Sequence, residues 1–437
     1  MKILLISPAV SAQKRTVKEL MMPQLALYIL KGLTPAGHEV KIIEEEVDVI
    51  DPDEECDLVG ISCMTANAPR AYEVAAEFRK RNKTVVMGGV HPTILPDEAL
   101  QHADTVVMGE AEGVWEDLLL DFTAGKLKAR YHNPTPDLDR YIEKDFSKII
   151  RKRLFNIVPI MTSRGCPYNC DFCCVTDLFG KKIRHAPVKN IVRDIVTSGA
   201  KNFMFLDDNI IGHPKYAKEL FRALIPLKIR WVGQASMSLL KETELLELAA
   251  ESGCKVLFFG LESVTEAPLK TMKKSLKDTE DLRQTIKKIK KAGILIHASM
   301  IFGFDSDTPQ VFKETVDFLI RNKISTVSFN ILTPYPGTKT YNDLKLSGRL
   351  LTDNWQYYDH NTVVFSPTNM SPLELQQGKT DARTRFYRRI SFVKRLLGNL
   401  NSPVLFTATN LGHMKQSRVE RGRLAGLKQE LSDTYKL

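Results

Sequence analysis

The stretch TSRGCPYNCDFCCVT, residues 162–176, places four of the seven cysteines of this 437-residue chain within nine positions. Cys166, Cys170 and Cys173 form a C-x3-C-x2-C pattern directly after an apolar run that predicts a strand near 157–162. The odd number of cysteines and the short N-terminal apolar run, MKILLISPAV, argue against a secreted disulfide framework. The thiols are therefore expected to be reduced and to serve as metal ligands.

Three thiolates on one loop suit a [4Fe–4S] cluster and leave one iron without a protein ligand. A zinc site is the alternative, and it needs a fourth ligand, for which Cys174 and His185 are candidates. Structural zinc sites favour two paired C-x2-C knuckles, a pattern that this chain lacks. The spacing therefore favours iron and sulfur over zinc.

Composition sets only broad limits on function. The chain carries a formal net charge of +10, which suits an anionic membrane surface, an acidic substrate or nucleic acid and does not choose among them. No run of about eighteen apolar residues occurs, so no transmembrane helix is expected. We expect a cytoplasmic protein, either free or peripheral to a membrane, and no nucleic-acid partner.

Apolar runs alternating with helical patterns predict an α/β fold in four parts. Residues 1–125 should form a doubly wound, Rossmann-like domain of five parallel strands, and residues 126–155 a linker. Residues 156–345 should form a partial (β/α)6 barrel, and residues 346–437 a mainly helical domain. The expected strands lie near 2–7, 39–43, 57–62, 84–89, 104–110, 157–162, 202–206, 230–235, 255–261, 295–302 and 326–332.

Ligands of parallel α/β sheets bind beyond the carboxyl ends of the strands. In the first domain these ends carry the candidate binding residues Ser62, Gly88, Gly89, His91, Gly109 and Glu110. The paired glycines would let a flat ligand approach the backbone closely, although an ordinary strand-to-helix turn explains them as well. A loop histidine such as His91 either faces a ligand or forms structural hydrogen bonds.

At CPYNCDFC, residues 166–173, the sequence resembles the radical S-adenosylmethionine (SAM) superfamily, whose hallmark is C-x3-C-Φ-x-C with an aromatic Φ, here Phe172. The resemblance implies that Cys166, Cys170 and Cys173 ligate a [4Fe–4S] cluster whose open iron binds SAM. One electron, delivered by a donor of the flavodoxin or ferredoxin type, then cleaves SAM to methionine and a 5′-deoxyadenosyl radical. That radical takes a hydrogen atom from the substrate.

The same resemblance implies that SAM is bound at the strand ends of the barrel. Glu262 is the strongest single candidate, because family members often use a carboxylate after the fourth strand. MIFGFDSDT, residues 300–308, resembles the family's glycine motif beside adenine. Helix caps, turns and plain core strand are the competing explanation for these residues. The expected SAM-binding residues are Phe172, Asp207, Asp208, Gln234, Ser236, Glu262, Ile301 and Gly303.

The organisation of nearly the whole chain resembles the superfamily branch that has an N-terminal cobalamin-binding domain. The stretches GGVHPTILPDEAL (88–100) and VVMGEAEGVWEDLL (106–119) carry this resemblance. The D-x-H-x-x-G motif, whose histidine coordinates cobalt in methionine synthase-like proteins, is missing, as is common in cobalamin-dependent radical SAM proteins. Cobalamin is therefore expected as a third cofactor, with a cofactor-free scaffold as the alternative.

These resemblances imply cobalamin-dependent C-methylation of an unactivated carbon on a hydrophobic small molecule. YPGTKTYNDLKLSGRL (335–350) resembles members that act on hopanoids, and lipids and tetrapyrroles are the expected substrate classes. Cobalamin-free cyclisation, C–C coupling or oxidation is the first alternative. The second alternative is a tRNA methylthiotransferase, which would need three further cysteines in the first domain, where only Cys56 and Cys63 occur. The third alternative is a non-catalytic corrinoid or electron-transfer protein.

The C-terminal stretch RTRFYRRISFVKRLL, residues 383–397, places apolar residues near helical spacing among arginines. Such a helix lies either against a membrane surface or against another part of the protein.

Overall fold

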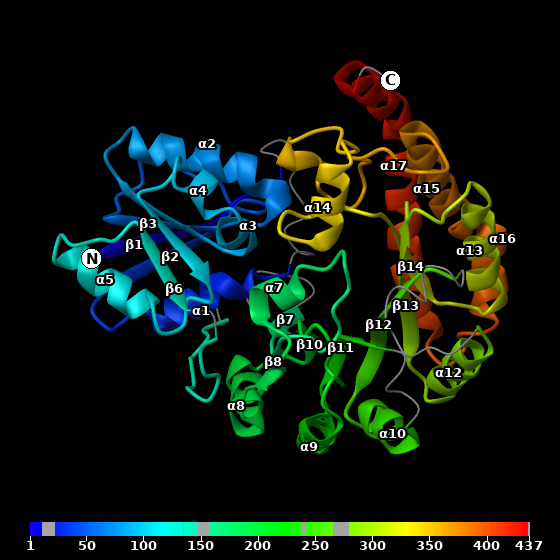
Figure 1. Cartoon of the computed structure of the whole chain (residues 1–437). Coiled ribbons are helices and arrows are strands. Elements are labelled where there is room, and N and C mark those ends of the chain that lie inside the picture. Colours follow the sequence, from blue (N-terminus) through cyan, green and yellow to red (C-terminus); the bar gives the residue numbers. More distant parts are fainter. Residues whose placement is uncertain (11–21, 134, 147–156, 237–241, 265–278, 436–437) are drawn as a thin grey trace. The chain divides into compact units, whose positions relative to one another are not determined.

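The structure, a computed structural model, describes residues 1–10, 22–133, 135–146, 157–236, 242–264 and 279–435 (Figure 1). These residues form two compact units. Unit 1 contains Met1–Pro167, Cys174–Leu206 and Asn354–Gln356. Unit 2 contains Tyr168–Cys173, Asp207–Asp353 and Tyr357–Leu437. Each unit is described by itself below.

Unit 1 is built on a parallel sheet of six strands in the order β2-β1-β3-β4-β5-β6. Its strands are β1 (Lys2–Ser7), β2 (Glu39–Glu44), β3 (Leu58–Ser62), β4 (Thr84–Gly88), β5 (Thr105–Gly109) and β6 (Arg130–Asn133). The first five confirm the expected strands. The sixth lies in the expected linker, because the sequence RYHN alternates polar residues with a single buried tyrosine and has no apolar run to reveal it.

Helices cover both faces of this sheet, which makes it doubly wound. On one face α1 (Leu25–Leu33) and α5 (Trp115–Thr123) pack against Ile3, Leu5 and Val107. On the other, α2 (Ala68–Arg79) packs Ala71, Val74 and Phe78 against alternate residues of the same strands. Strands buried on both faces explain why the sequence shows near-continuous apolar runs. The remaining helices of this part are α3 (Val90–Ile94) and α4 (Pro96–Ala99).

Unit 1 also contains the start of the second strand–helix series. Its elements are β7 (Ile157–Ile160), the antiparallel pair β8 (Ser163–Arg164) and β9 (Arg184–His185), α7 (Val175–Phe179), α8 (Val188–Ser198) and β10 (Asn202–Phe205). The second sheet has the order β14-β13-β12-β11-β10-β7, and its pairings β7–β10, β11–β12, β12–β13 and β13–β14 are parallel.

Unit 2 continues this series and ends in helices. Its elements are α9 (Pro214–Leu224), β11 (Arg230–Ala235), α10 (Thr243–Glu251), β12 (Cys254–Glu262), α12 (Thr279–Lys291), β13 (Leu295–Phe302), α13 (Gln310–Arg321), β14 (Thr326–Ile331), α14 (Lys339–Leu346), α15 (Pro372–Phe386), α16 (Arg389–Leu396) and α17 (Pro403–Tyr435). Six strands with helices between them and a helical C-terminal part confirm the expected α/β class. Helix α13 begins at Gln310, with Pro309 as its N-cap.

Two glycines at comparable helix-to-strand turns of unit 2 have different surroundings. Gly253 has φ +98°, and a Cβ there would lie 2.0 Å from the backbone oxygen of Ile229. Gly293 has φ +80°, and a Cβ there would meet nothing within 4 Å. Both conformations disfavour a side chain, but only Gly253 also has no space for one.

We therefore expect Gly253→Ala to lower the free energy of unfolding much more than Gly293→Ala. The conformational penalty alone is about 1 kcal/mol at either position, and the backbone clash at Gly253 adds to it. Denaturant unfolding of the two variants measures the difference. Equal losses of stability would show that the Ile229 carbonyl moves away at no cost.

Candidate active site

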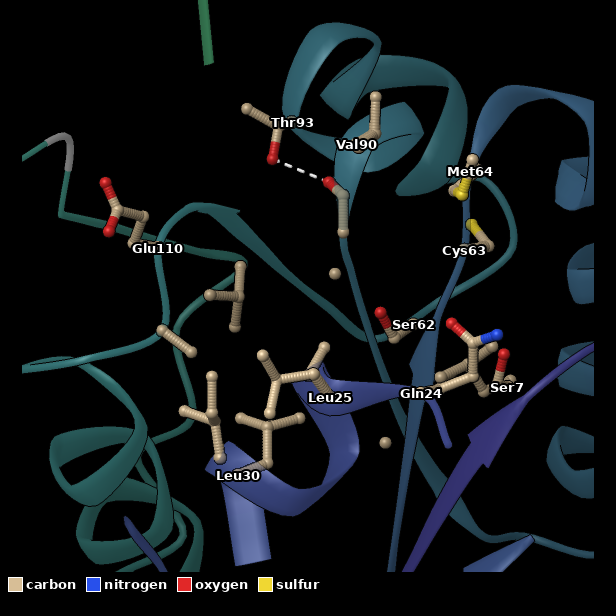
Figure 2. A pocket seen from close by; sticks show the side chains of 18 of the residues that line it. Ser7, Gln24, Leu25, Leu30, Ser62, Cys63, Met64, Val90, Thr93 and Glu110 are labelled. Atoms are coloured by element: carbon tan, nitrogen blue, oxygen red, sulfur yellow. Dashed lines mark hydrogen bonds between the residues drawn. The ribbon is translucent and has the colours of Figure 1, made fainter. Parts of the chain in front are cut away.

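A cavity of about 460 Å³ lies at the carboxyl ends of the strands of unit 1 (Figure 2). Five of the expected binding residues line it, namely Ser62, Gly88, Gly89, Gly109 and Glu110. They come from β3, β4 and β5 and from the turns that follow these strands. The cavity therefore lies where the parallel topology predicts a ligand site.

The inner wall of the cavity is apolar, and its rim is polar. Leu25, Leu30 and Val107 are among the apolar lining residues, and Figure 2 shows the first two beside each other on α1. The hydroxyls of Ser7 and Ser62 lie at the strand ends. This lining suits a large amphipathic ligand with an apolar portion inside and polar groups at the rim, which fits a corrinoid.

The two strand-end turns at the rim are joined through one hydroxyl. The Thr93 hydroxyl donates to the Gly89 carbonyl at 2.7 Å and accepts from the Gly109 backbone N–H at 3.0 Å. Gly89 has φ +99°, and a Cβ there would lie 2.6 Å from the Cys63 carbonyl oxygen. The turn itself therefore requires a glycine at position 89. This steric need explains Gly89 as well as the expected close approach of a ligand to the backbone does.

His91 is fully buried, and its ring contacts Tyr72 and Glu98. Its Nε2 lies 3.0 Å from the Tyr72 hydroxyl and 3.2 Å from the Glu98 carboxylate, to which the Trp355 indole donates at 2.9 Å. His91 is not among the cavity-lining residues, although Val90 and Thr93 of the same helix are. Its role as a cobalamin contact remains a prediction.

Three buried charges and the half-buried Arg184 form a network at the rim of the cavity. The Arg164 guanidinium donates to Glu110 and, at 2.6 Å, to Glu112, and Arg184 donates to Glu110 from the other side. Arg184 also donates to the Pro136 carbonyl at 2.7 Å. Glu110 and Glu112 are only 4% and 8% exposed, so these pairs are shielded from solvent. Sequence reasoning selected Glu110 but did not identify its arginine partners.

The network shifts the ionisation of its members. Burial alone would raise the pKa of Glu112, but the charge and hydrogen bond of Arg164 outweigh it, so the pKa lies below its usual value. Burial alone would lower the pKa of Arg164, and the carboxylates of Glu112 and Glu110 more than reverse this, so the pKa is raised. Glu112 and Arg164 thus each favour the charged form of the other.

The predicted cluster cysteines lie on the loop between β8 and α7. The first of them, Cys166, follows Arg164 by two residues. The Cys166 N–H donates to the Gly180 carbonyl at 3.4 Å in unit 1, and the Cys173 N–H donates to the Cys170 carbonyl at 3.0 Å in unit 2. None of the seven cysteines is in a disulfide. No three His, Cys, Asp or Glu side chains converge into a ready-made metal site among the described residues, so the fit to a cluster rests on the donor type and spacing.

Residues on both sides of the cysteine loop line the cavity of unit 1. Met161 and Arg164 precede the cysteines, and Leu178 and Phe179 follow them on α7. The segment that carries the predicted cluster ligands is therefore continuous in sequence with residues of the cavity wall.

In unit 2, hydrogen bonds connect the loop after β10 to the end of β11. Asn209 donates through Nδ2 to the Ser236 hydroxyl at 3.2 Å and accepts from the Ser236 backbone N–H at 3.1 Å. The N–H of Ile210 donates to the Gln234 carbonyl at 2.9 Å. Asp207 and Asp208 stand just before Asn209 in this loop, and Asp207 is buried. The expected polar residues of these two strand ends are thus placed together, with their roles toward SAM still predictions.

Glu262 ends β12 in an unusual backbone conformation. Its φ is +61°, and the Ser263 N–H donates to the Leu261 carbonyl at 2.7 Å, which makes Glu262 the centre of a three-residue turn. Such turns are strained by about 1–3 kcal/mol for a residue with a side chain. Glu262 is 8% exposed. Strained residues concentrate at functional sites, which supports the expectation that this carboxylate binds a ligand.

The next strand, β13, ends in a second tight turn. Gly303 has φ +107°, and the Asp307 carboxylate accepts from the N–H groups of Gly303 and Phe304 at 2.9 and 3.1 Å. Burial raises the pKa of Asp307 to about 6, although these two N–H groups oppose the shift. The Phe304 ring packs edge-on against Phe172 of the cysteine loop, with centroids 6.1 Å apart. Asp307 organises the motif that contains Ile301 and Gly303, and sequence reasoning missed it because an aspartate before a helix also fits an ordinary cap.

The fold and these residues define a class of enzyme. Residues 160–319 match the model of the radical SAM superfamily, and residues 14–119 match that of the B12-binding domain. The chain belongs to the radical SAM superfamily, in the branch with an N-terminal B12-binding domain, and is a cobalamin-dependent radical SAM methyltransferase. Its cofactors are a [4Fe–4S] cluster, SAM and cobalamin.

The similar proteins with assigned names include several methyltransferases. Bacteriochlorophyllide d C-12(1)-methyltransferase of Chlorobaculum tepidum is 32% identical over 411 residues, which cover 91% of this chain and 90% of the relative. The C-8(2)-methyltransferase of the same organism is 32% identical over 86% of this chain and 88% of the relative. Hopanoid C-2 methylase of Rhodopseudomonas palustris is 24% identical over 76% of this chain and 66% of the relative.

Among solved structures, the radical SAM methyltransferase TsrM of Kitasatospora setae, with cobalamin and a [4Fe–4S] cluster bound, has a similar fold. The TM-score is 0.71 at 16% identity, covering 95% of this chain and 99% of TsrM. The cobalamin-dependent radical SAM enzyme OxsB, with aqua-cobalamin bound, gives 0.67 at 14% identity, covering all of this chain and 79% of OxsB. At these identities the likeness concerns the fold.

The buried network predicts a specific pH dependence of stability. Because the pKa of Glu112 is lowered from its ordinary 4.5, its carboxylate stabilises the fold above that pH, and the contribution is lost as the pH falls through the lower native value. We expect Glu112→Gln to cost about 2 kcal/mol at neutral pH and progressively less below pH 4.5. Urea unfolding across this range measures the difference.

The matched control is Glu116→Gln, which breaks the more exposed pair of Glu116 with Arg140. It should cost less than about 1 kcal/mol. A Glu112 variant that loses no more stability than the control at neutral pH would contradict the stabilising role of the network.

If cobalamin binds in this cavity, a substitution that fills the cavity should abolish cobalamin binding. Leu30→Trp places a larger side chain into the cavity, so we expect little cobalt and no corrin absorbance in the purified protein, while iron content is retained. Leu120→Trp is the control, because Leu120 is 68% exposed on α5 of the same domain. Full cobalamin occupancy of the Leu30 variant would show that the corrinoid is bound elsewhere.

Proposed function

We propose that this enzyme methylates an unactivated carbon of a hydrophobic small molecule, with a tetrapyrrole as the substrate class. The observation that carries the proposal is the cavity of unit 1, because residues flanking the cysteine loop help to form its wall. The two tetrapyrrole methyltransferases that are 32% identical over most of their length support this substrate class over the hopanoid class, represented by a relative at 24%.

An uncharged face of the second sheet supports a hydrophobic substrate. In register across β12, β13 and β14 lie Phe258, His297 and Thr326, followed by Gly260, Ser299 and Ser328. In β12, β13 and β14, this face carries no Asp, Glu, Lys or Arg before Glu262 at the end of β12. Most of its side chains are half-buried, whereas the opposite face, with Leu257, Phe259 and Val327, is fully buried.

The polar groups of this face are paired with one another. His297 contacts the Thr326 hydroxyl at 2.9 Å through Nδ1 and the Ser328 hydroxyl at 3.0 Å through Nε2. Asn330 donates to the Ser299 hydroxyl at 2.9 Å. Burial, together with His413 and Arg383, lowers the pKa of His297 to about 3, so the imidazole is neutral at physiological pH. A neutral surface of this kind favours an apolar ring system over an anionic polymer such as tRNA.

Different residues of this chain would bind each of the three cofactors. The thiolates of Cys166, Cys170 and Cys173 would hold the cluster, and the strand-end residues Asn209 with Ser236, Glu262 and Gly303 would position SAM. The cavity around Leu30 would hold the corrinoid and exclude water. When bound, these cofactors supply radical chemistry at carbon, given an electron donor of the flavodoxin or ferredoxin type, and a transferable methyl group.

The test is methyl transfer from SAM labelled in its methyl group, using anaerobically prepared protein loaded with cobalamin. A magnesium chlorin that lacks one side-chain methyl group, a lipid extract and tRNA are offered separately. We expect label in the chlorin. Label in the lipid fraction alone would replace the tetrapyrrole by a lipid, and label only in tRNA or protein would overturn the hydrophobic substrate.

Cysteine variants show whether any transfer depends on the assigned ligands. Cys170→Ala should abolish label transfer and 5′-deoxyadenosine formation and remove the cluster absorbance. Cys174→Ala is the matched control from the same loop, and it should retain all three. Equal losses in the two variants would reject the assignment of ligands.

A further inference from the structure

In helix α16 of unit 2 the two most buried side chains are polar, and the exposed side chains include two large apolar ones. Ser391 and Arg395 are 2% and 0% exposed, whereas Ile390 and Val393 of the same helix are 70% and 55% exposed. In a globular protein an amphipathic helix normally packs its apolar side inward. The reversed arrangement in α16 therefore needs an explanation.

Hydrogen bonds on the buried side fix the helix in this orientation. The Arg395 guanidinium donates to the Ser325 carbonyl at 2.6 Å, to Asn410 Oδ1 at 2.9 Å and to the Phe386 carbonyl at 3.2 Å. It also lies 3.9 Å from the centroid of the Phe386 ring. Rotating α16 to bury Ile390 and Val393 would break these hydrogen bonds, so these two side chains remain in solvent.

Exposed apolar residues continue along the chain from α16 through the connecting residues 397–402 to the start of α17, the helix that follows it in Figure 1. Ile390, Val393, Leu397, Leu400 and Val404, here named the apolar stripe, recur at alternating spacings of three and four residues. They are 70%, 55%, 68%, 60% and 82% exposed. Single exposed apolar residues are common, but five large ones within fifteen residues of the chain indicate a contact surface.

The stretch of sequence that carries the apolar stripe is basic and contains no acidic residue. The sequence contains no Asp or Glu between Asp381 and Glu420, a stretch of 38 residues. The exposed basic residues in it are Arg388, Arg389, Lys394, Lys415 and Arg418. Arg388, Arg389 and Lys394 belong to α16 or its cap and so lie beside the stripe. The partner of this surface should therefore be both apolar and negatively charged.

We propose that the apolar stripe and its flanking arginines and lysines bind the surface of an anionic lipid membrane. The apolar side chains enter the boundary between headgroups and acyl chains, and the cations contact lipid phosphates. The described helices include none with the length and apolar character needed to cross a membrane, and α16 with the start of α17 needs only to lie in the interface plane. The proposal concerns a surface of unit 2 and does not depend on the identity of the methylated substrate.

A second copy of this chain suits the surface less well. A two-fold contact through the apolar stripe would place Arg388, Arg389 and Lys394 of one copy against the same residues of the other. The stretch supplies no carboxylate to compensate these charges. An anionic lipid surface satisfies both the apolar and the charged part of the patch.

The test is co-sedimentation of the full-length holoenzyme with vesicles. We expect binding to mixed phosphatidylcholine and phosphatidylglycerol vesicles, weakened by salt, and much weaker binding to phosphatidylcholine alone. Ile390→Gln with Leu397→Gln and Val404→Gln should weaken binding at least about tenfold. Arg388→Gln, Arg389→Gln and Lys394→Gln should each weaken it about fivefold, and only on the anionic vesicles.

The matched control replaces three equally exposed apolar residues elsewhere, Leu120→Gln, Val196→Gln and Leu346→Gln, which are 68%, 60% and 88% exposed. This control should bind as the unaltered protein does, and circular dichroism establishes that all variants are folded. Absence of binding to anionic vesicles would overturn the proposal. So would equal loss in control and stripe variants, or a dimer in solution that the stripe variant dissociates.

Discussion

The first unit depends on the ion pairs that the buried guanidinium of Arg164 forms with Glu110 and Glu112. A buried charge costs several kcal/mol unless it is paired, and here Glu110 and Glu112 supply both the charges and the hydrogen-bond acceptors. Glu110 continues the chain from Gly109, whose N–H is held by Thr93, and Arg164 lies two residues before Cys166. One ion-pair network therefore joins the rim of the cofactor cavity to the beginning of the cysteine loop.

Parallel strands bring all the chemistry of each unit to one sheet edge, but the two units use that edge differently. In unit 1 the edge is built around glycines and apolar side chains, which leaves a cavity for a large cofactor. In unit 2 the strand ends carry paired polar groups, such as Asn209 with Ser236, and a buried carboxylate at Glu262. The first arrangement suits the holding of a preformed ring, and the second suits the orientation of a smaller polar molecule.

The sequence predicts most of the architecture, because buried parallel strands produce apolar runs and three closely spaced cysteines produce a recognisable pattern. It does not reveal β6, whose four residues contain a single buried apolar side chain, Tyr131. It also does not pair Glu110 with Arg164 and Arg184, which stand 54 and 74 residues away, since only the folded chain brings them together. For α16 the periodicity shows that two faces exist, but the side that packs inward is decided by the partners of Arg395.

The ends of β12 and β13 each place a residue at positive φ, and comparing these two residues distinguishes a residue chosen for the backbone from one whose side chain is needed. Both turns require a positive φ, +107° at Gly303 and +61° at Glu262. At position 303 the chain has glycine, which adopts this conformation without strain, and a Cβ would crowd Leu375 and Phe365 at 3.0 Å. At position 262 it has a glutamate, although glycine would relieve about 1–3 kcal/mol of strain. Backbone geometry accounts for the glycine but not for the glutamate, and this is the physical reason to expect that the carboxylate itself is needed at the strand end.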